Sequence, residues 1–310
     1  MTILTLTFNA SIDHILQTER IQQHEKNILT SHHSFIGGKG INVAYTLGKL
    51  GIPATACGLI GQDAIEDLTQ KFCRLDVKVR FTITDSTRHT FKIHENFEGK
   101  DTEFNQQGIS ISPEQFEQLI TILQNSMDGI HWLVLSGSIP PGVPDGVYAD
   151  LIKHTRHKEI FTTLDSSGVP LVKGLQAKPS LLRINRFELE ELYPGHDHTP
   201  AAIQTIFNEI HQQGIQYCVI SFGSEGAIGS DRNRIWKTKV PKVAPQSLTG
   251  AGDAMTAGLV SSLSKGYSFK EALLFGSALA TASTLQLEPG DFSQRDLEQV
   301  LQETTIKIYN

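Results

Sequence analysis

The sequence predicts an α/β fold in which a mostly parallel sheet is flanked by helices. Short β-rich segments alternate with amphipathic segments of helical period through most of the 310 residues. Such alternation is typical of parallel strands joined by helices that cover both faces of the sheet. The apolar content of 39% is ordinary for a globular protein, and no internal repeat or low-complexity linker divides the chain. We therefore expect a single domain over residues 1–310.

The predicted elements follow one another in a regular order. The segments expected as strands of the main sheet are residues 3–8, 55–59, 132–136, 161–165 and 217–221. The amphipathic segments predict helices at residues 42–50, 64–75, 113–126, 146–155 and 201–213, and residues 252–287 predict two helices joined near Gly266. Residues 12–35 and 77–105 alternate like strands with no helix between them. These two segments predict a small antiparallel sheet set on the main domain.

Charge and cysteine content limit the class of partner and compartment. The formal net charge is −6 and the basic residues form no run, which argues against nucleic acid or an anionic membrane surface as the main partner. Three scattered cysteines without a C-x-x-C pair fit a reducing compartment. The first residues lack a basic leader, and the longest apolar region, residues 272–287, is too short to span a bilayer. We expect a cytoplasmic protein that attracts any anionic substrate through a local cluster of cations.

Gly250, Ala251, Gly252 and Asp253 stand where a loop turns into a predicted helix. The first N–H groups of a helix lack partners within it and carry the positive end of its dipole, so glycines there let a phosphate come close. A carboxylate at such a site repels the ligand, unless it takes the proton from a hydroxyl that attacks the phosphorus. The motif predicts phosphoryl transfer to an alcohol with Asp253 as the base. An ordinary helix start explains the same residues.

Two further motifs indicate a hydroxyl-rich ligand. Three glycines within residues 37–40 precede Asn42, so the backbone can approach a ligand that Asn42 then hydrogen-bonds. Asp13 follows the first predicted strand, and loops at the carboxyl ends of strands bind ligands in α/β sheets. The alternatives are a glycine-rich βα turn for the first motif and an ordinary turn residue for Asp13.

Two other motifs have a structural and a functional interpretation. Asn185 and Glu188 lie on one helix face and can hold a hydrated magnesium ion, although the residues alone favour a capping box. Ser221, Gly223 and Gly226 close a predicted strand and fit either a loop around a nucleotide or a hairpin turn. Neither G-x-x-x-x-G-K-[ST] nor G-x-G-x-x-G occurs, so P-loop and dinucleotide-binding interpretations lose support.

Taken in order, six motifs resemble the ribokinase-like phosphofructokinase-B family over essentially the whole chain. They are residues 9–13, 37–42, 136–142, 185–188, 221–226 and 250–253. Gly-Gly-Lys-Gly-Ile-Asn and Ser-Gly-Ser-Ile-Pro-Pro-Gly are typical of the branch that contains 1-phosphofructokinases and tagatose-6-phosphate kinases. The resemblance implies a ribokinase-like fold whose antiparallel β-lid, from residues 12–35 and 77–105, closes over the sugar and supplies a homodimer contact.

The resemblance also implies an activity and the residues that carry it. The expected reaction transfers the γ-phosphate of ATP, with Mg²⁺, to a primary hydroxyl of a phosphorylated ketohexose. Asp253 would be the base, and the amides of Ala251, Gly252 and Asp253 would form the anion hole. The residues that would hold the sugar and the phosphate it already carries are Asp13, Lys26, Gly37, Gly38, Lys39, Asn42, Arg88 and Ser138. Those near the nucleotide and its magnesium would be Arg183, Asn185, Glu188, Ser221, Gly223, Gly226 and Ser247.

The chain departs from the family pattern at two motifs. The usual Asn-Pro-Ala is Asn9-Ala10-Ser11, and the usual Lys-Pro-Asn is Arg183-Ile184-Asn185. Arginine keeps the charge of lysine but not its geometry, so nucleotide affinity or selectivity can differ. Neither change removes the proposed base.

Several alternatives stay open at the level of sequence. Residues 102–105 favour fructose 1-phosphate as acceptor by resemblance, which gives fructose 1,6-bisphosphate. Tagatose 6-phosphate, giving tagatose 1,6-bisphosphate, and fructose 6-phosphate are alternatives, as is an unphosphorylated sugar. A catalytically silent sugar-phosphate sensor on the same fold is the non-enzymatic alternative. The residues decide neither the acceptor nor the oligomeric state nor any allosteric regulation.

Overall fold

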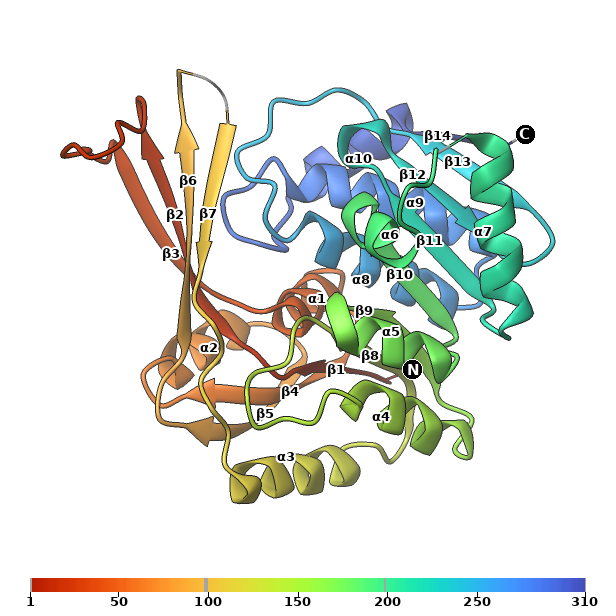
Figure 1. Cartoon of the computed structure of the whole chain (residues 1–310), viewed down its shortest axis with the longest axis horizontal. Helices are drawn as coiled ribbons and strands as arrows, with labels where there is room; N and C mark the ends of the chain where they lie inside the picture. Colours follow the sequence, from red (N-terminus) through yellow and green to blue (C-terminus); the bar gives the residue numbers. More distant parts are fainter. Residues whose placement is uncertain (1, 98–99, 198, 310) are drawn as a thin grey trace.

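The chain forms a large sheet, a small sheet and surrounding helices (Figure 1). This computed structural model describes residues 2–97, 100–197 and 199–309, which contain a ten-stranded and a four-stranded sheet. In spatial order the large sheet consists of β14 (Thr305–Ile308), β13 (Ile235–Lys239), β12 (Ala227–Ser230), β11 (Tyr217–Ser221), β10 (Leu181–Asn185), β9 (Phe161–Asp165), β8 (Ile130–Ser136), β1 (Thr2–Thr7), β4 (Ala54–Gly61) and β5 (Val77–Thr84). The helices are α1 (Lys39–Lys49), α2 (Ile65–Phe72), α3 (Pro113–Asn125), α4 (Val147–Arg156), α5 (Gly168–Gln176), α6 (Arg186–Leu192), α7 (Pro200–Gln212), the 3₁₀ helix η1 (Gly223–Glu225), α8 (Ala251–Ser264), α9 (Phe269–Ser283) and α10 (Gln294–Glu303).

The large sheet is parallel over most of its width. All neighbouring pairs from β11 across to β5 are parallel, and β1 runs between β4 and β8 with Leu4 opposite Thr55 on one side and Leu133 on the other. Only β12, β13 and β14 add antiparallel pairs, at one edge of the sheet. Because the parallel strands all end on the same side, the loops that follow them gather along one edge.

Helices cover both faces because successive strand residues point to opposite sides. Leu4 faces the side covered by α3, α4, α5 and α7, where it shares a core with Tyr148 and Phe207. Ile3 faces the other side, where α1, α8 and α9 pack and Leu259 belongs to the same core. This packing of helices on both faces of the sheet confirms the predicted α/β class. In the part of the chain that the structure describes, no helix combines the length and apolar character needed to cross a bilayer.

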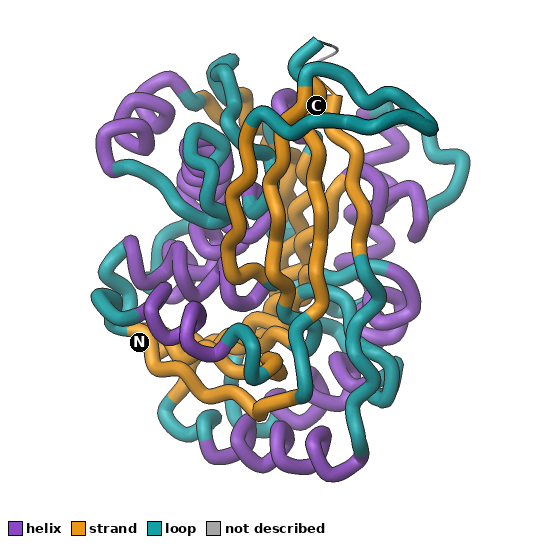
Figure 2. The backbone as a smooth tube through the Cα atoms, turned by 90° about the vertical axis from the view of Figure 1, so that its left-hand side faces the viewer, coloured by secondary structure: helices purple, strands orange, loops and turns teal. Residues whose placement is uncertain are grey.

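The small sheet stands on the main domain as a separate lid (Figure 2). It is formed by β3 (Ser31–Gly37), β2 (Ser11–Thr18), β6 (Arg88–Glu95) and β7 (Lys100–Asn105), in that order. The outer pairs are antiparallel as predicted, whereas the central pair β2–β6 is parallel. Residues 77–84 were predicted to be part of the lid, which is wrong. They form β5, which pairs with β4 at the edge of the large sheet, and its first five residues alternate between half-buried and exposed.

Candidate active site

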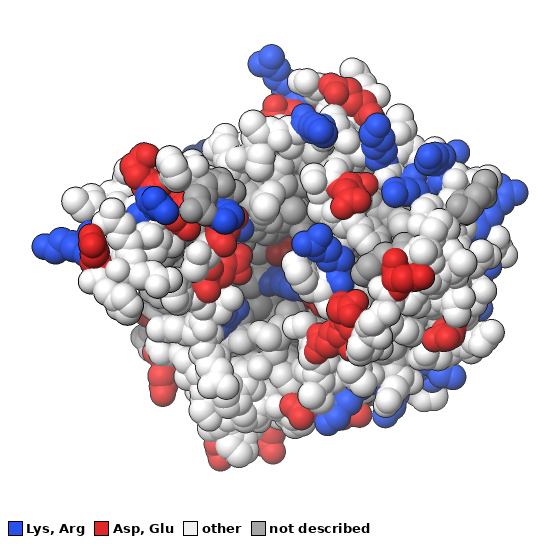
Figure 3. Space-filling view, turned by 45° about the horizontal axis from the view of Figure 1, so that its top comes forward, with Lys and Arg blue, Asp and Glu red and all other residues white. Residues whose placement is uncertain are grey.

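Loops and helix starts converge on a hollow at the carboxyl edge of the large sheet. Figure 3 shows this hollow between the lid and the main body, with basic and acidic side chains on its walls. Strands β9, β10 and β11 end there at Asp165, Asn185 and Ser221, while α1 begins there at Lys39 and α8 at Ala251. The site is therefore built from segments far apart in the sequence.

The start of α8 has the geometry of an anion site. Gly250 is the N-cap in a left-handed conformation (φ +81°), and a Cβ atom there would lie 2.6 Å from the backbone nitrogen of Gly290. Only glycine meets both conditions without strain. The helical ladder begins with the Ala254 N–H, which donates to the Gly250 carbonyl, so the N–H groups of Gly252 and Asp253 before it are left for a ligand. The Ala251 N–H, also predicted to face the anion, instead donates to the Leu248 carbonyl at 3.4 Å.

Asp253 lies in the first turn of α8 and is 5% exposed. The Asn42 side-chain Nδ2 donates to Asp253 Oδ2 at 2.8 Å. Burial raises the pKa of Asp253 to about 6, with Lys39 acting to lower it and Asp165 to raise it. A carboxylate with such a pKa is ionised at neutral pH and still accepts a proton readily, as a general base must.

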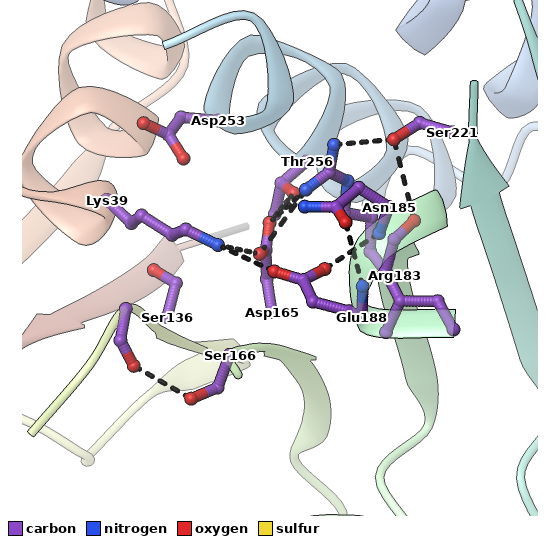
Figure 4. Close-up of polar contacts among 12 residues, drawn as sticks. Lys39, Ser136, Asp165, Ser166, Arg183, Asn185, Glu188, Ser221, Asp253 and Thr256 are labelled. Atoms are coloured by element: carbon purple, nitrogen blue, oxygen red, sulfur yellow. Dashed lines mark hydrogen bonds and ion pairs between the residues drawn. The ribbon is translucent and has the colours of Figure 1, made fainter. Parts of the chain in front are cut away.

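Asp165 organises the centre of the site, although it belongs to no recognised sequence motif. It is fully buried at the end of β9, where it accepts hydrogen bonds from Lys39 Nζ at 2.6 Å and Thr256 Oγ1 at 2.9 Å (Figure 4). Arg183 NH1 lies 3.5 Å from its Oδ2. Burial acts to raise the pKa of Asp165, but the charges of Lys39 and Arg183 outweigh it and lower the pKa. The one available sequence signal was an aspartate at the end of a predicted strand.

Arg183 places its guanidinium beneath the start of α8. The side chain is buried, and its NH2 donates to Ser221 Oγ at 2.8 Å. A Cβ atom on Gly252 would lie 2.6 Å from the same NH2 group, so the helix backbone rests directly on the guanidinium. The arginine that departs from the family pattern thus adds positive charge at the anion site.

Asn185 and Glu188 form the capping box that the residues favoured. Asn185 Oδ1 accepts from the N–H groups of Phe187 and Glu188, and Glu188 Oε2 accepts from the Asn185 N–H at 2.7 Å. The other oxygen, Glu188 Oε1, lies 3.7 Å from Lys39 Nζ. Burial raises the pKa of Glu188 even though Lys39 acts to lower it. Capping and a metal-binding role are compatible, because one oxygen of Glu188 still faces the hollow.

The residues assigned to the sugar lie at the base of the lid. The Asp13 carboxylate rests against Gly37, where a Cβ atom would be 1.9 Å from Asp13 Oδ2, and it accepts a hydrogen bond from Thr90 Oγ1 at 2.7 Å. Arg88 Nε donates to the Asn9 carbonyl at 3.4 Å. Asp13, Gly37 and Arg88 are thus brought together as predicted.

Ser138 joins this group through Asn9. The Asn9 side-chain Nδ2 donates to Ser138 Oγ at 3.0 Å, so one residue connects the loop after β8 with Arg88. Asn9 belongs to a recognised motif but was not predicted as a site residue. Its side-chain amide and its backbone carbonyl bind Ser138 and Arg88 respectively, two residues that were both expected near a phosphate.

Two predicted phosphate-binding lysines are not part of this group. Lys26 is exposed in the loop between β2 and β3, at one end of the lid. Arg88 lies at the other end, where it is the register partner of Ser11. The length of these lid strands separates the two residues. Lys39 starts α1, and its ammonium points to Asp165 and Glu188 because those buried carboxylates attract it.

The residues expected around a nucleotide occupy the far side of the hollow. Ser221 ends β11, and Gly223 and Gly226 form the turn into the antiparallel strand β12, so this segment is a hairpin. Phe222 N–H donates to the Gly226 carbonyl at 2.8 Å across the turn. Ser247 is buried before α8, and its N–H donates to the Thr284 carbonyl at 3.2 Å.

The chain is similar to known proteins over almost its whole length. A family model described as pfkB family carbohydrate kinase matches residues 6–295. The chain is 33% identical over 291 residues to a 1-phosphofructokinase of Borreliella burgdorferi, with 92% of each chain covered. It is 31% identical over 314 residues to a 1-phosphofructokinase of Escherichia coli, with 99% of each covered.

A solved structure shares the same architecture. Phosphofructokinase-2 from Escherichia coli in complex with substrates and products superposes with a TM-score of 0.89 at 29% identity. The match covers 97% of this chain and 99% of that chain. The likeness therefore includes both the large sheet and the lid.

Proposed function

The chain belongs to the pfkB family of carbohydrate kinases, and on that basis we propose that it transfers the γ-phosphate of ATP to a primary hydroxyl of a phosphorylated ketohexose. Fructose 1-phosphate is the favoured acceptor, because the two relatives compared are 1-phosphofructokinases. The observation that carries the proposal is Asp253, a buried carboxylate with a pKa of about 6 in the first turn of α8, beside the free N–H group of Gly252.

The reaction begins with proton removal by Asp253. Its carboxylate takes the proton of the sugar hydroxyl, and the oxygen forms a bond to the γ-phosphorus. The bond from that phosphorus to the oxygen it shares with the β-phosphate breaks, and ADP leaves. The amides of Gly252 and Asp253 face the negative charge that develops on the transferred group, and the guanidinium of Arg183 beneath them adds to its stabilisation.

Recognition of the acceptor uses the base of the lid. Asp13 and Asn42 bind sugar hydroxyls, and the backbone of Gly37 and Gly38 allows the sugar to come close. Arg88 and Ser138 bind the phosphate that the sugar already carries, since a charged fork and a hydroxyl suit its oxygens. Closure of the lid over the sugar would exclude water and suppress hydrolysis of ATP.

The metal and nucleotide groups use the far side of the hollow. Magnesium takes few protein ligands, and the carboxylates of Asp165 and Glu188 already face one cation, Lys39, so this donor set fits the ion. Asn185 contributes by holding Glu188 in its cap and would reach the ion through water. The bound ion neutralises phosphate charge. Ser221, Gly223, Gly226 and Ser247 contact the nucleotide.

A coupled ADP-release assay tests the proposal. With ATP and Mg²⁺ we compare fructose 1-phosphate, fructose 6-phosphate, tagatose 6-phosphate and unphosphorylated fructose. We expect the highest kcat/KM for fructose 1-phosphate. A higher value for tagatose 6-phosphate or fructose 6-phosphate reassigns the acceptor, and a higher value for fructose reassigns the enzyme to neutral sugars. Binding of all phosphates without ADP release identifies a silent sensor.

We also propose a homodimer formed through the outer face of the lid, in the cytoplasm. Phe91 lies opposite Phe104 on the face that turns away from Asp13, and Phe104 is 59% exposed. The cysteines Cys57, Cys73 and Cys218 are free, which suits a reducing compartment. Light scattering of the wild type and of Phe104→Asp tests the dimer: the variant should be monomeric, and two identical masses would contradict this interface.

A further inference from the structure

Lys39 lies where a metal ion would be expected to lie. Its Nζ is 2.6 Å from Asp165 Oδ1 and 3.7 Å from Glu188 Oε1. Both are carboxylate oxygens, which divalent cations take as ligands, and Asp165 is fully buried and Glu188 nearly so. Figure 4 shows the ammonium reaching between the two carboxylates from the side of α1.

We propose that Lys39 is an exchangeable internal cation, which occupies the carboxylate pair of Asp165 and Glu188 until a divalent metal arrives with the nucleotide and displaces it toward the phosphates. This inference rests on the proposed function for the direction in which the lysine moves. It assigns Lys39 a role on the nucleotide side of the hollow in the free protein and a role beside the phosphates during the reaction.

The charges around the pair require a cation at all times. Three carboxylates, Asp165, Glu188 and Asp253, meet two cations, Lys39 and Arg183, in a buried setting. Without Lys39, the two buried carboxylates of Asp165 and Glu188 would face each other with only the Arg183 guanidinium, 3.5 Å from Asp165, to compensate their charge, and buried like charges that are not fully compensated are unfavourable. A lysine and a divalent ion cannot both fill the same position. One must therefore leave when the other binds.

The Lys39 side chain has room to move, whereas the Arg183 side chain is held in place. The Lys39 side chain is 32% exposed and stands in the first turn of α1, with a flexible stem. A Cβ atom added at Gly137 would lie 3.7 Å from Lys39 Cβ and 3.9 Å from Lys39 Cγ, so the Lys39 side chain already runs beside the loop that carries Ser138. Rotation about the stem carries the ammonium away from Asp165 within the same hollow. The guanidinium of Arg183 is instead buried and bound to Ser221.

Metal binding to the nucleotide-free protein tests the proposal without any turnover. Mn²⁺ is titrated into the wild type, Lys39→Met, Lys39→Arg and Lys49→Met. Lys49 is a matched control, because it also lies on α1 and pairs with an aspartate, Asp291, away from the site. We expect Lys39→Met to bind Mn²⁺ at least about 10-fold more tightly, since a unit positive charge next to the ligands is removed. Lys39→Arg and Lys49→Met should resemble the wild type.

Two outcomes would overturn the proposal in this titration. One is an unchanged or weaker Mn²⁺ affinity of Lys39→Met. The other is an equal gain in Lys49→Met, which would show that the change is unrelated to Asp165. Adding Asp165→Asn to Lys39→Met should abolish the gain. Thermal melting of each variant shows whether it is folded under the conditions of the titration.

A structure of the wild type with Mn²⁺ and a non-hydrolysable ATP analogue gives an independent test that needs no variant. We expect Lys39 Nζ to lie beyond hydrogen-bond distance of Asp165, more than about 3.5 Å away. A lysine still bound to Asp165 beside the metal contradicts the exchange. The ADP-release assay of the wild type tests the kinase function separately, so either idea can fail while the other stands.

Discussion

Replacing Asp253 with asparagine should reduce turnover and increase stability at the same time. Burial raises the pKa of Asp253 from 3.8 to about 6, so the folded protein binds this proton more tightly than the unfolded chain does. The contribution of this proton to the free energy of unfolding is fully present below pH 3.8 and is lost as the pH rises through 6. At about pH 8 the ionised carboxylate therefore destabilises the folded state by roughly 3 kcal/mol, at about 1.4 kcal/mol for each pH unit between the two pKa values.

Asparagine removes this ionisation and keeps the local hydrogen bond, because a carboxamide oxygen can still accept from Asn42 Nδ2. Urea unfolding should show Asp253→Asn more stable than the wild type by up to about 3 kcal/mol near pH 8, with the difference shrinking to below about 1 kcal/mol near pH 4. Turnover should fall by about 10²- to 10⁴-fold, with sugar-phosphate binding nearly intact. A variant that is less stable at both pH values, or that retains near-normal turnover, would refute the reasoning.

Three further substitutions test other parts of the site. Arg88→Ala should raise the KM for the sugar phosphate by about 10- to 100-fold with little change in kcat, since charged hydrogen bonds contribute about 1.5–3 kcal/mol; an unchanged KM for the phosphorylated sugar would remove Arg88 from phosphate recognition. Gly252→Ala places a methyl group 2.6 Å from Arg183 NH2, and we expect kcat to fall by about 10²-fold because the anion site is displaced. A fully active variant would show that the amides at the start of α8 do not face the transferred group. Arg183→Lys keeps the charge but loses the hydrogen bond to Ser221 Oγ at 2.8 Å. Initial-rate kinetics should show that the KM for ATP rises by about 10-fold and that the KM for the sugar is unchanged. A raised KM for the sugar with an unchanged KM for ATP would place Arg183 on the sugar side.

Local signals were sufficient for the long helices and central strands. Residues 113–126 were predicted as a helix, and α3 spans Pro113–Asn125, because Ser112 and Gln115 form a capping box and Pro113 takes the first position. The two helices around Gly266 were also predicted correctly. In these segments the local pattern and the tertiary packing favour the same structure.

Short and edge elements could not be predicted in the same way. The five-residue strand β10 and the seven-residue helix α6 are too short to show a period. The sequence of β5 alternates like that of a lid strand, and only its pairing with β4 places it in the large sheet. The structure of such segments depends on their partner strand, and the local sequence contains no information about that partner.

The same contrast applies to the site. Asp253 was predicted because its neighbours along the chain form a motif with a physical explanation. Asp165 was not, because its importance appears only when Lys39, Arg183 and Thr256 converge on it from three other elements. The direction of the Lys39 side chain likewise depends on carboxylates more than a hundred positions away. Residue types that meet only after folding leave no local signal.

The most direct test of the kinase mechanism is a crystal structure of the wild type with fructose 1-phosphate and a non-hydrolysable ATP analogue. We predict that the Asp253 carboxylate lies within about 3.2 Å of a primary sugar hydroxyl, and that this oxygen stands in line with the γ-phosphorus held at the start of α8. A γ-phosphate held away from the amides of α8, or a sugar whose hydroxyl cannot reach Asp253, would contradict it.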